Sequence, residues 1–261
     1  MKILSGRVAL RLVGPLLFVG TWELLSRLGW VRADFIPAPH AVAVAGLELA
    51  RSGELAGHIR ASAFRAAIGF VTGSVIGIAT GIATARLKVF QGLTDPLLQM
   101  FRAIPSLAFV PLAVFWFGIG ETAKLFLIGW GVFFPVWVAT FLGIRDTSPL
   151  IQRAGAALGA RGWRMLWFVV IPAALPMILA GLRVSLATAF VVLVAAELAG
   201  ALAGVGYMIQ VAQLSFRVDQ MFVGLITLGA MGLGADLLFR LVTRRLFPWY
   251  GAERINDERL R

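Results

Sequence analysis

Three charged residues, Arg102, Arg183 and Glu197, lie within stretches that are otherwise long and apolar. A charge at the centre of a membrane costs about 2.5–3.5 kcal/mol on insertion scales, so such residues are functional candidates. Each arginine could draw an anion along a pathway, or it could reach outward to lipid phosphates. Glu197 could pair with Arg217 or with a basic residue of a partner protein, or it could be solvated.

Two backbone features extend this set. Pro105 and Pro111 can break a helix and turn the freed carbonyl groups toward a cavity. Three glycines between residues 200 and 206 loosen the segment around Tyr207, which could form a re-entrant gate or a plain interfacial loop. The candidate residues of a pathway are therefore Arg102, Pro105, Arg183, Glu197 and Tyr207.

The sequence offers no residue set for catalysis. The chain has no cysteine, and His40 and His58 are expected to be two isolated loop histidines, so neither a catalytic residue nor a metal site is expected. A membrane-embedded enzyme would need clustered His, Asp or Glu, whereas Glu197 and Asp236 are isolated in their apolar runs. The sequence also lacks a G-x-x-x-x-G-K-[ST] phosphate loop, so it cannot hydrolyse ATP by that route, and no bound cofactor is expected.

The composition places these candidates in a membrane protein. The chain has 261 residues, 59% of them hydrophobic and 14% charged, whereas a soluble domain carries about 25% charged residues. Spanning segments need about 20 mostly apolar residues and must be helices, because lipid offers the backbone no hydrogen-bond partner. The sequence predicts an all-α polytopic membrane protein with about six transmembrane helices, at Leu10–Trp30, Ser62–Ala85, Leu93–Phe117, Lys124–Ile144, Ala174–Ala199 and Gln220–Val242.

The distribution of basic residues predicts the orientation. The net charge is +11, and with the N-terminus inside, the inner segments hold more Lys and Arg than the outer ones. This asymmetry predicts a multi-pass protein of the cell inner (plasma) membrane with both termini cytoplasmic. The positive charge is thereby assigned to topology and to membrane lipid, and nucleic acid is not an expected partner.

A row of glycines recurs every four residues from Gly69 to Gly81 in the second expected span. This spacing places the glycines on one helix face, where two backbones can approach closely. The row could serve packing within the chain or an interface with another subunit.

The polar loop from Arg145 to Pro176 is the part that we expect to contact something soluble. Its stretch Thr147-Ser148-Pro149 is typical of a helix start, with a hydroxyl cap followed by proline. A short helix over Pro149–Leu158 should then end at Gly159 in a left-handed conformation.

A second short segment is predicted over Arg161–Ile171, stopping before Pro172. The two segments would form an elbow that projects from the membrane. The elbow could lie on anionic lipid, helped by Arg153, Arg161 and Arg164, or it could dock onto a partner protein.

The stretch RAGAALGARGWRMLWFVVIPAALP, residues 153–176, resembles the EAA loop of ABC importer permeases. Gly159 matches the central glycine of that loop and Ala154 its first alanine. Arg153 departs from the pattern, because glutamate is usual there, and Gly155 stands where a second alanine is usual. The resemblance implies that the elbow couples to an ATPase, through Pro149, Arg153, Ala154, Gly155, Ala156, Leu158, Gly159, Ala160 and Arg161.

Two further stretches narrow the resemblance. FRAIPSLAFVPLAVFWFGIGE, residues 101–121, and AAELAGALAGVGYMI, residues 195–209, are similar to the nitrate/sulfonate/taurine branch of these permeases. The implied fold is the type I ABC importer permease fold. The implied organisation is an N-terminal transmembrane helix and outer loop (1–56), an ABC type-1 permease domain (57–243, with its coupling loop at 145–174) and a charged cytoplasmic tail (244–261).

The resemblance also implies partners and a substrate class. A homodimer of permeases would work with two cytoplasmic ATPase subunits, which use ATP and Mg, and with an outer solute-binding protein; a heterodimer of permeases stays open. The expected cargo is a small anion, with sulfonate or taurine favoured and nitrate next. The alternative is a stand-alone secondary transporter or channel, which usually shows an internal inverted repeat, and no such repeat is evident in this sequence.

Overall fold

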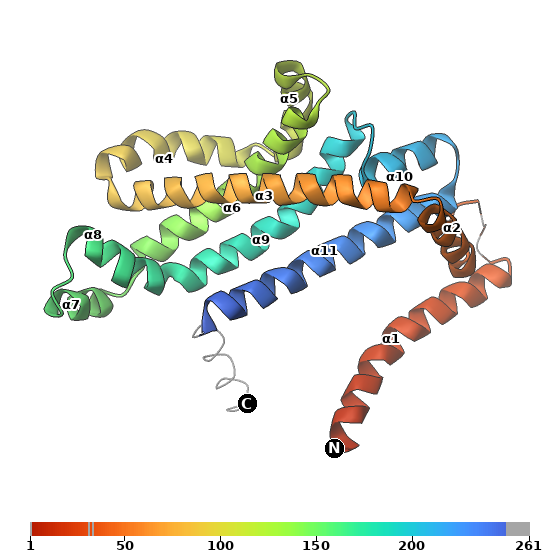
Figure 1. Ribbon diagram of the computed structural model, residues 1–261, viewed down its shortest axis with the longest axis horizontal. Helices are drawn as coiled ribbons and strands as arrows, with labels where there is room; N and C mark the ends of the chain where they lie inside the picture. Colours follow the sequence, from red (N-terminus) through yellow and green to blue (C-terminus); the bar gives the residue numbers. More distant parts are fainter. Residues whose placement is uncertain (1, 31, 33, 249–261) are drawn as a thin grey trace. The chain divides into compact units, whose positions relative to one another are not determined.

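The chain is helical throughout the part that the structure describes (Figure 1). The structure is a computed structural model that describes residues 2–30, 32 and 34–248. The longer helices are α1 (Lys2–Arg27), α3 (Glu54–Arg86), α6 (Glu121–Arg145), α9 (Ile171–Leu198) and α11 (Val218–Leu246). The shorter ones are α2 (Pro39–Arg51), α4 (Lys88–Ala103), η1 (Ser106–Phe109), α5 (Val110–Phe117), α7 (Pro149–Ala157), α8 (Gly162–Met165), η2 (Leu166–Val170) and α10 (Val205–Leu214).

Several of these helices are long and apolar enough to cross a membrane. Within the described residues they are α3, α6, α11 and the continuous run Gly162–Leu198, and the bent pair of α4 with η1–α5 counts as a fifth if its two parts form one broken span. The architecture confirms the predicted all-α membrane fold, and its four or five candidate spans are roughly consistent with the predicted number of about six.

Contacts divide the chain into two compact units. Residues 1–61 and 202–229 form the first unit, and residues 62–201 and 230–261 form the second. The elements that bear on function lie mainly in the second unit.

In the second unit, α3 packs closely against α6, and the two helices run in the same direction. A Cβ atom built on Gly69 would lie 2.6 Å from the Cβ of Ile128, and one built on Gly81 would lie 2.6 Å from the Cβ of Thr140. Only glycine allows so close an approach. The glycine row therefore serves packing within the chain, the first of its two interpretations.

Because α3 and α6 are parallel, the segment between them must return the chain to the side where α3 began. That segment is bent by 90° between α4 and η1–α5. Pro105 lies at the bend, and it holds Ile104 in an extended conformation (φ −83°, ψ 121°). The predicted third span, Leu93–Phe117, therefore consists of two helical parts, and the break predicted at Pro105 is present.

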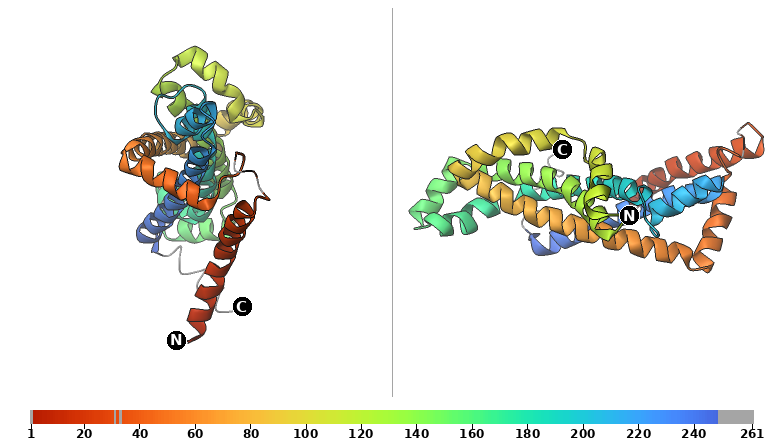
Figure 2. Two further views of the ribbon diagram at one scale, coloured as in Figure 1. Left: turned by 90° about the vertical axis from the view of Figure 1, so that its right-hand side faces the viewer. Right: turned by 90° about the horizontal axis from the view of Figure 1, so that it is seen from above.

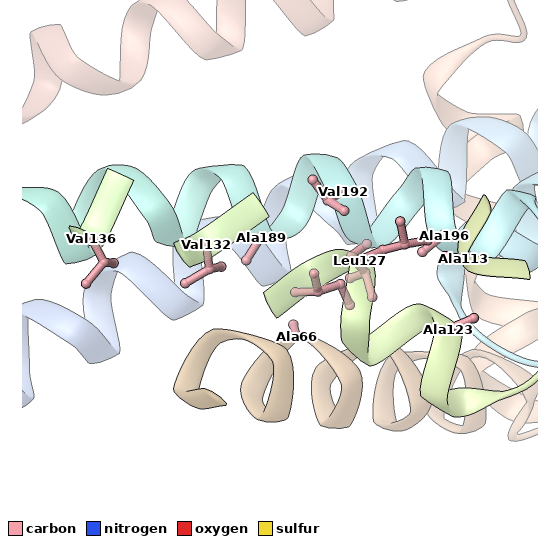
Figure 3. Packing of buried hydrophobic residues seen from close by; sticks show 11 residues of the cluster. Ala66, Ala113, Ala123, Leu127, Val132, Val136, Ala189, Val192 and Ala196 are labelled. Carbon is pink, nitrogen blue, oxygen red and sulfur yellow. The ribbon is translucent and has the colours of Figure 1, made fainter. Parts of the chain in front are cut away.

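Helices α6 and α9 form an antiparallel hairpin at the centre of the second unit, and they lie side by side in both views (Figures 1 and 2). Gly131 of α6 faces Val192 of α9, whereas Gly143, further along α6, faces Met177, nearer the start of α9. This order shows that the two helices run in opposite directions. Helices α3 and α5 complete the core. Figure 3 shows its buried side chains, which include Ala66, Ala113, Leu127, Val132, Val136, Ala189, Val192 and Ala196.

The helix that follows the elbow is longer than predicted. The expected stop before Pro172 is wrong, because the helix is continuous from Gly162 to Leu198. Pro172 lacks the N–H group that an α-helix needs, and the preceding turn, η2, is a π-helix that accommodates the missing bond. The fifth span therefore begins before Ala174.

The first unit joins α1, α2, α10 and the start of α11. The ring centroids of Trp22 and Phe222 lie 5.5 Å apart. Glu23 accepts a hydrogen bond from Arg27 Nε at 2.6 Å and pairs with His40 Nδ1 at 2.8 Å. His40 lies on α2 and His58 on α3, so the prediction of loop histidines is wrong: a helix begins at Pro39. Of the predicted tail, residues 244–246 belong to α11, and residues 249–261 lie outside the described residues.

Candidate functional site

A cavity of about 520 Å³ lies in the second unit, between the α4–η1 junction and the α6–α9 hairpin. The junction contributes Arg102, Ile104, Pro105 and Ser106. The remaining wall is apolar except for one hydroxyl and consists of Gly131, Phe134, Pro135, Val138, Ala139, Met177, Ala180, Gly181, Val184 and Thr188. Two of the predicted pathway residues, Arg102 and Pro105, thus line the same cavity.

Arg102 and Arg183 differ in their partners. Arg183 donates from Nε to Asp236 Oδ1 at 2.8 Å, and Arg240 also donates to Asp236. By contrast, no described residue forms a hydrogen bond or ion pair with the Arg102 side chain. Arg183 is not among the residues that line the cavity. The cationic group that the cavity presents therefore belongs to Arg102.

A polar cluster, buried except at Glu121, whose side chain is 52% exposed, joins α3, α6 and α9 at the end of the hairpin that is remote from the elbow. Arg65, which is 5% exposed, donates to both carboxylate oxygens of Glu121, at 2.6 and 2.7 Å. It also donates to Glu197 at 2.8 Å, and Ser62 donates to the same Glu197 oxygen at 2.7 Å. Lys124 Nζ lies 3.5 Å from Glu121. The cluster balances two cations against two anions.

The cluster corrects the expectation for Glu197. Its side chain is fully buried rather than solvated, and its partners come from α3. Arg217, the predicted partner, instead donates to Asp219 at 3.3 Å, and this hydrogen bond raises the pKa of Arg217. Whether Glu197 acts in a pathway stays a prediction.

Tyr207, the last pathway candidate, lies in the first unit. It belongs to α10, a regular helix, so the prediction of a plain loop is wrong, whereas the re-entrant gate stays a prediction. The ring centroids of Tyr207 and His58 lie 6.0 Å apart. His58 Nδ1 accepts a hydrogen bond from the Gly204 N–H at 3.1 Å.

The first helix of the elbow, α7, begins and ends as its sequence predicts. The Ser148 side chain accepts a hydrogen bond from the Leu150 N–H at 3.3 Å, and Pro149 occupies the first turn. At the other end, Gly159 has a φ of +83°. The N–H of Gly159 bonds to Ala156 and that of Ala160 to Gly155, both at 3.0 Å, which is the Schellman pattern of a glycine-ended helix.

The two departures from the EAA pattern occupy different surroundings. Gly155 is buried, and a Cβ atom built on it would lie 2.8 Å from Val169 Cγ2. Glycine therefore lets α7 pack against η2. Arg153 is exposed, as are most residues of α7, and Leu150 and Leu158 are 75% and 91% exposed. The elbow thus presents a free apolar and basic surface.

Sequence reasoning missed part of the site. Ser62, Arg65, Glu121 and Lys124 were not proposed as candidates, and neither was Ser106. The sequence could have indicated Ser106, because this residue directly follows Pro105 and so lies at the break that the proline was predicted to cause. In the described part of the chain, no cluster of metal-ligating side chains occurs.

The comparisons with known proteins agree with this arrangement. The family model described as binding-protein-dependent transport system inner membrane component matches residues 73–248. The chain is 39% identical to the putative aliphatic sulfonates transport permease protein SsuC of Bacillus subtilis (strain 168), over 90% of this chain and 85% of that protein. It is 34% identical to the taurine transport system permease protein TauC of Escherichia coli (strain K12), over 95% and 92%.

A solved structure shows the same fold. A crystal structure of an amino acid ABC transporter with histidines matches with a TM-score of 0.59 and 17% sequence identity, over 76% of this chain and 96% of that one. At this identity the match concerns the arrangement of helices alone.

Proposed function

The chain belongs to the family of binding-protein-dependent transport system inner membrane components, and from this premise we propose that it imports a small anion, with a sulfonate or taurine favoured and nitrate next. Members of this family are the permease subunits of ABC importers and are not enzymes; a separate subunit hydrolyses ATP. The family also implies a solute-binding protein as a partner.

The observation that carries the choice of an anion is the Arg102 side chain in the cavity. A positive charge inside a membrane protein normally has a counter-charge or marks a pathway for ions and substrates. Arg183 has Asp236 as its counter-charge, whereas no described residue supplies one for Arg102. An anionic substrate would supply that charge. The names of the two permeases reported above, which concern sulfonates and taurine, support the same class.

In this proposal, the elbow transmits the energy of ATP hydrolysis from the ATPase subunits to the permease. ATP-driven closure of two ATPase subunits would move α7, and the α6–α9 hairpin would carry that motion to the cavity. Because α6 and α9 interlock through glycines along their length, the hairpin can move as one body. The proposal includes a homodimer of permeases, cytoplasmic termini, and ATP and Mg bound by the partner subunits only.

Reconstituted transport tests this proposal. The permease and its ATPase are placed in proteoliposomes with the cognate binding protein, and uptake of labelled butanesulfonate, taurine and nitrate is measured with and without ATP. We expect uptake of a sulfonate that requires both ATP and the ATPase. Uptake by the permease alone would favour a secondary transporter or channel instead.

Gly159 provides a test of the coupling role. Valine at this position disfavours the φ of +83°, so Gly159→Val should end uptake and co-purification of the ATPase while membrane insertion persists. Gly159→Asn is the matched control, because asparagine tolerates the left-handed conformation, and it should retain most of the uptake. Full transport by Gly159→Val would contradict the coupling role.

A further inference from the structure

The cavity has one polar end and one apolar wall. At the polar end, the side chains of Arg102 and Ser106 form no hydrogen bond with any residue that the structure describes. Both groups therefore keep their donors for a ligand. A guanidinium and a hydroxyl are suited to the oxygens of a sulfonate headgroup, because donors to an ionised acceptor form the stronger hydrogen bonds.

A glycine on α6 makes room beside Ser106. A Cβ atom built on Gly131 would lie 3.4 Å from Ser106 Oγ and 3.6 Å from the methyl carbon of Thr188. A larger residue would crowd the serine. The Thr188 hydroxyl already donates to the Val184 carbonyl at 3.3 Å, so the hydroxyl donor that remains available in this wall is that of Ser106.

The opposite wall is apolar. Phe134 and Val138 contribute to it from α6, and Met177, Ala180 and Val184 contribute from α9, where their spacing of three and four residues places them on one helix face. Such a wall stabilises an alkyl chain and penalises a charge, because a buried charge without a partner loses its hydration.

We propose that the permease itself selects organic anions with an uncharged apolar tail, binding the headgroup at Arg102 and Ser106 and the tail along Met177, Ala180 and Val184. This inference rests on the proposed function and makes the permease a second specificity filter behind the binding protein. Taurine would place its ammonium group against the apolar wall, and nitrate would leave that wall unused.

Binding to the permease–ATPase complex in nanodiscs, without the binding protein, tests the inference. Methanesulfonate, ethanesulfonate and butanesulfonate are titrated by calorimetry, together with taurine and nitrate. We expect affinity to rise about fourfold per methylene group, which corresponds to about 0.8 kcal/mol each. Ethanesulfonate should bind at least about tenfold more tightly than taurine, its analogue with an added ammonium group.

Two variants separate the headgroup from the tail. Ser106→Ala should weaken all sulfonates about equally, by roughly tenfold. Ala180→Leu should weaken butanesulfonate more than methanesulfonate, because the larger side chain fills the space in which the alkyl tail would lie. Ala187→Leu, an exposed residue of α9 outside the cavity lining, is the control and should change neither affinity.

Equal binding of ethanesulfonate and taurine, no dependence on chain length, or no binding without the binding protein would each overturn the inference. These outcomes leave the proposed function intact if ATP-dependent uptake of an anion is still observed. If that uptake is absent for every anion, the proposed function fails instead.

Discussion

The polar cluster around Arg65 and the cavity around Arg102 place the same functional group in opposite situations. Arg65 is 5% exposed and donates hydrogen bonds to Glu121 and Glu197. Arg102 is exposed to a cavity, and no described residue pairs with it. The first arginine ties three helices together, whereas the second keeps its charge available. The comparison supports the proposal that Arg102 binds the substrate, whereas Arg65 has a structural role.

The largest effect should come from removing Arg65, the paired arginine, and it should be a loss of stability. Arg65→Met leaves two carboxylates, one of them fully buried, without their main partner, and removing one member of a buried pair costs about 3–5 kcal/mol. We expect a lower melting temperature of the purified protein in detergent and a loss of assembled complex. Arg60→Met, an exposed position on the same helix, is the control. Equal melting of the two variants would show that the cluster contributes no stability.

On the other side, Arg102→Ala should reduce uptake with little effect on stability. A hydrogen bond to a charged group contributes about 1.5–3 kcal/mol, so sulfonate uptake at low concentration should fall about tenfold or more. Because Arg102 has no partner among the described residues, melting and ATPase assembly should be unchanged. Arg86→Ala, exposed at the end of α3, is the control. Normal uptake by Arg102→Ala would remove this residue from the pathway.

Local patterns explain why much of the fold was predictable. Long apolar runs predicted the spans. Ser148 and Pro149 predicted the start of α7, and Gly159 predicted its end. These signals act within a few residues, so the sequence shows them directly. The bend at Pro105 was visible for the same reason, although its 90° angle was not.

The pairing of charges was not predictable, because it joins distant parts of the chain. Arg65 lies 56 residues from Glu121 and 132 from Glu197, and Arg183 lies 53 residues from Asp236. Sequence alone therefore could not separate Arg102 from Arg183. One local signal did indicate that Arg65 is paired. Arg65 precedes Gly69 by four residues, so it lies on the same face of α3 as the glycine row, and this face packs against α6.

The smallest effect should come from the third in-span arginine, because its pairing lies between the two extremes. The Arg183–Asp236 pair is partly exposed, at 43% and 23%, and Arg240 also donates to Asp236, so Asp236 keeps a cationic partner when Arg183 is lost. Arg183→Gln should thus lower the melting temperature less than Arg65→Met, and it should leave uptake near normal, since Arg183 does not line the cavity. The double variant Arg183→Gln/Asp236→Asn, which removes both charges, should melt no lower than the single one. A loss of uptake as large as that of Arg102→Ala, with normal melting, would place Arg183 in the pathway and show that a paired charge can also serve the substrate.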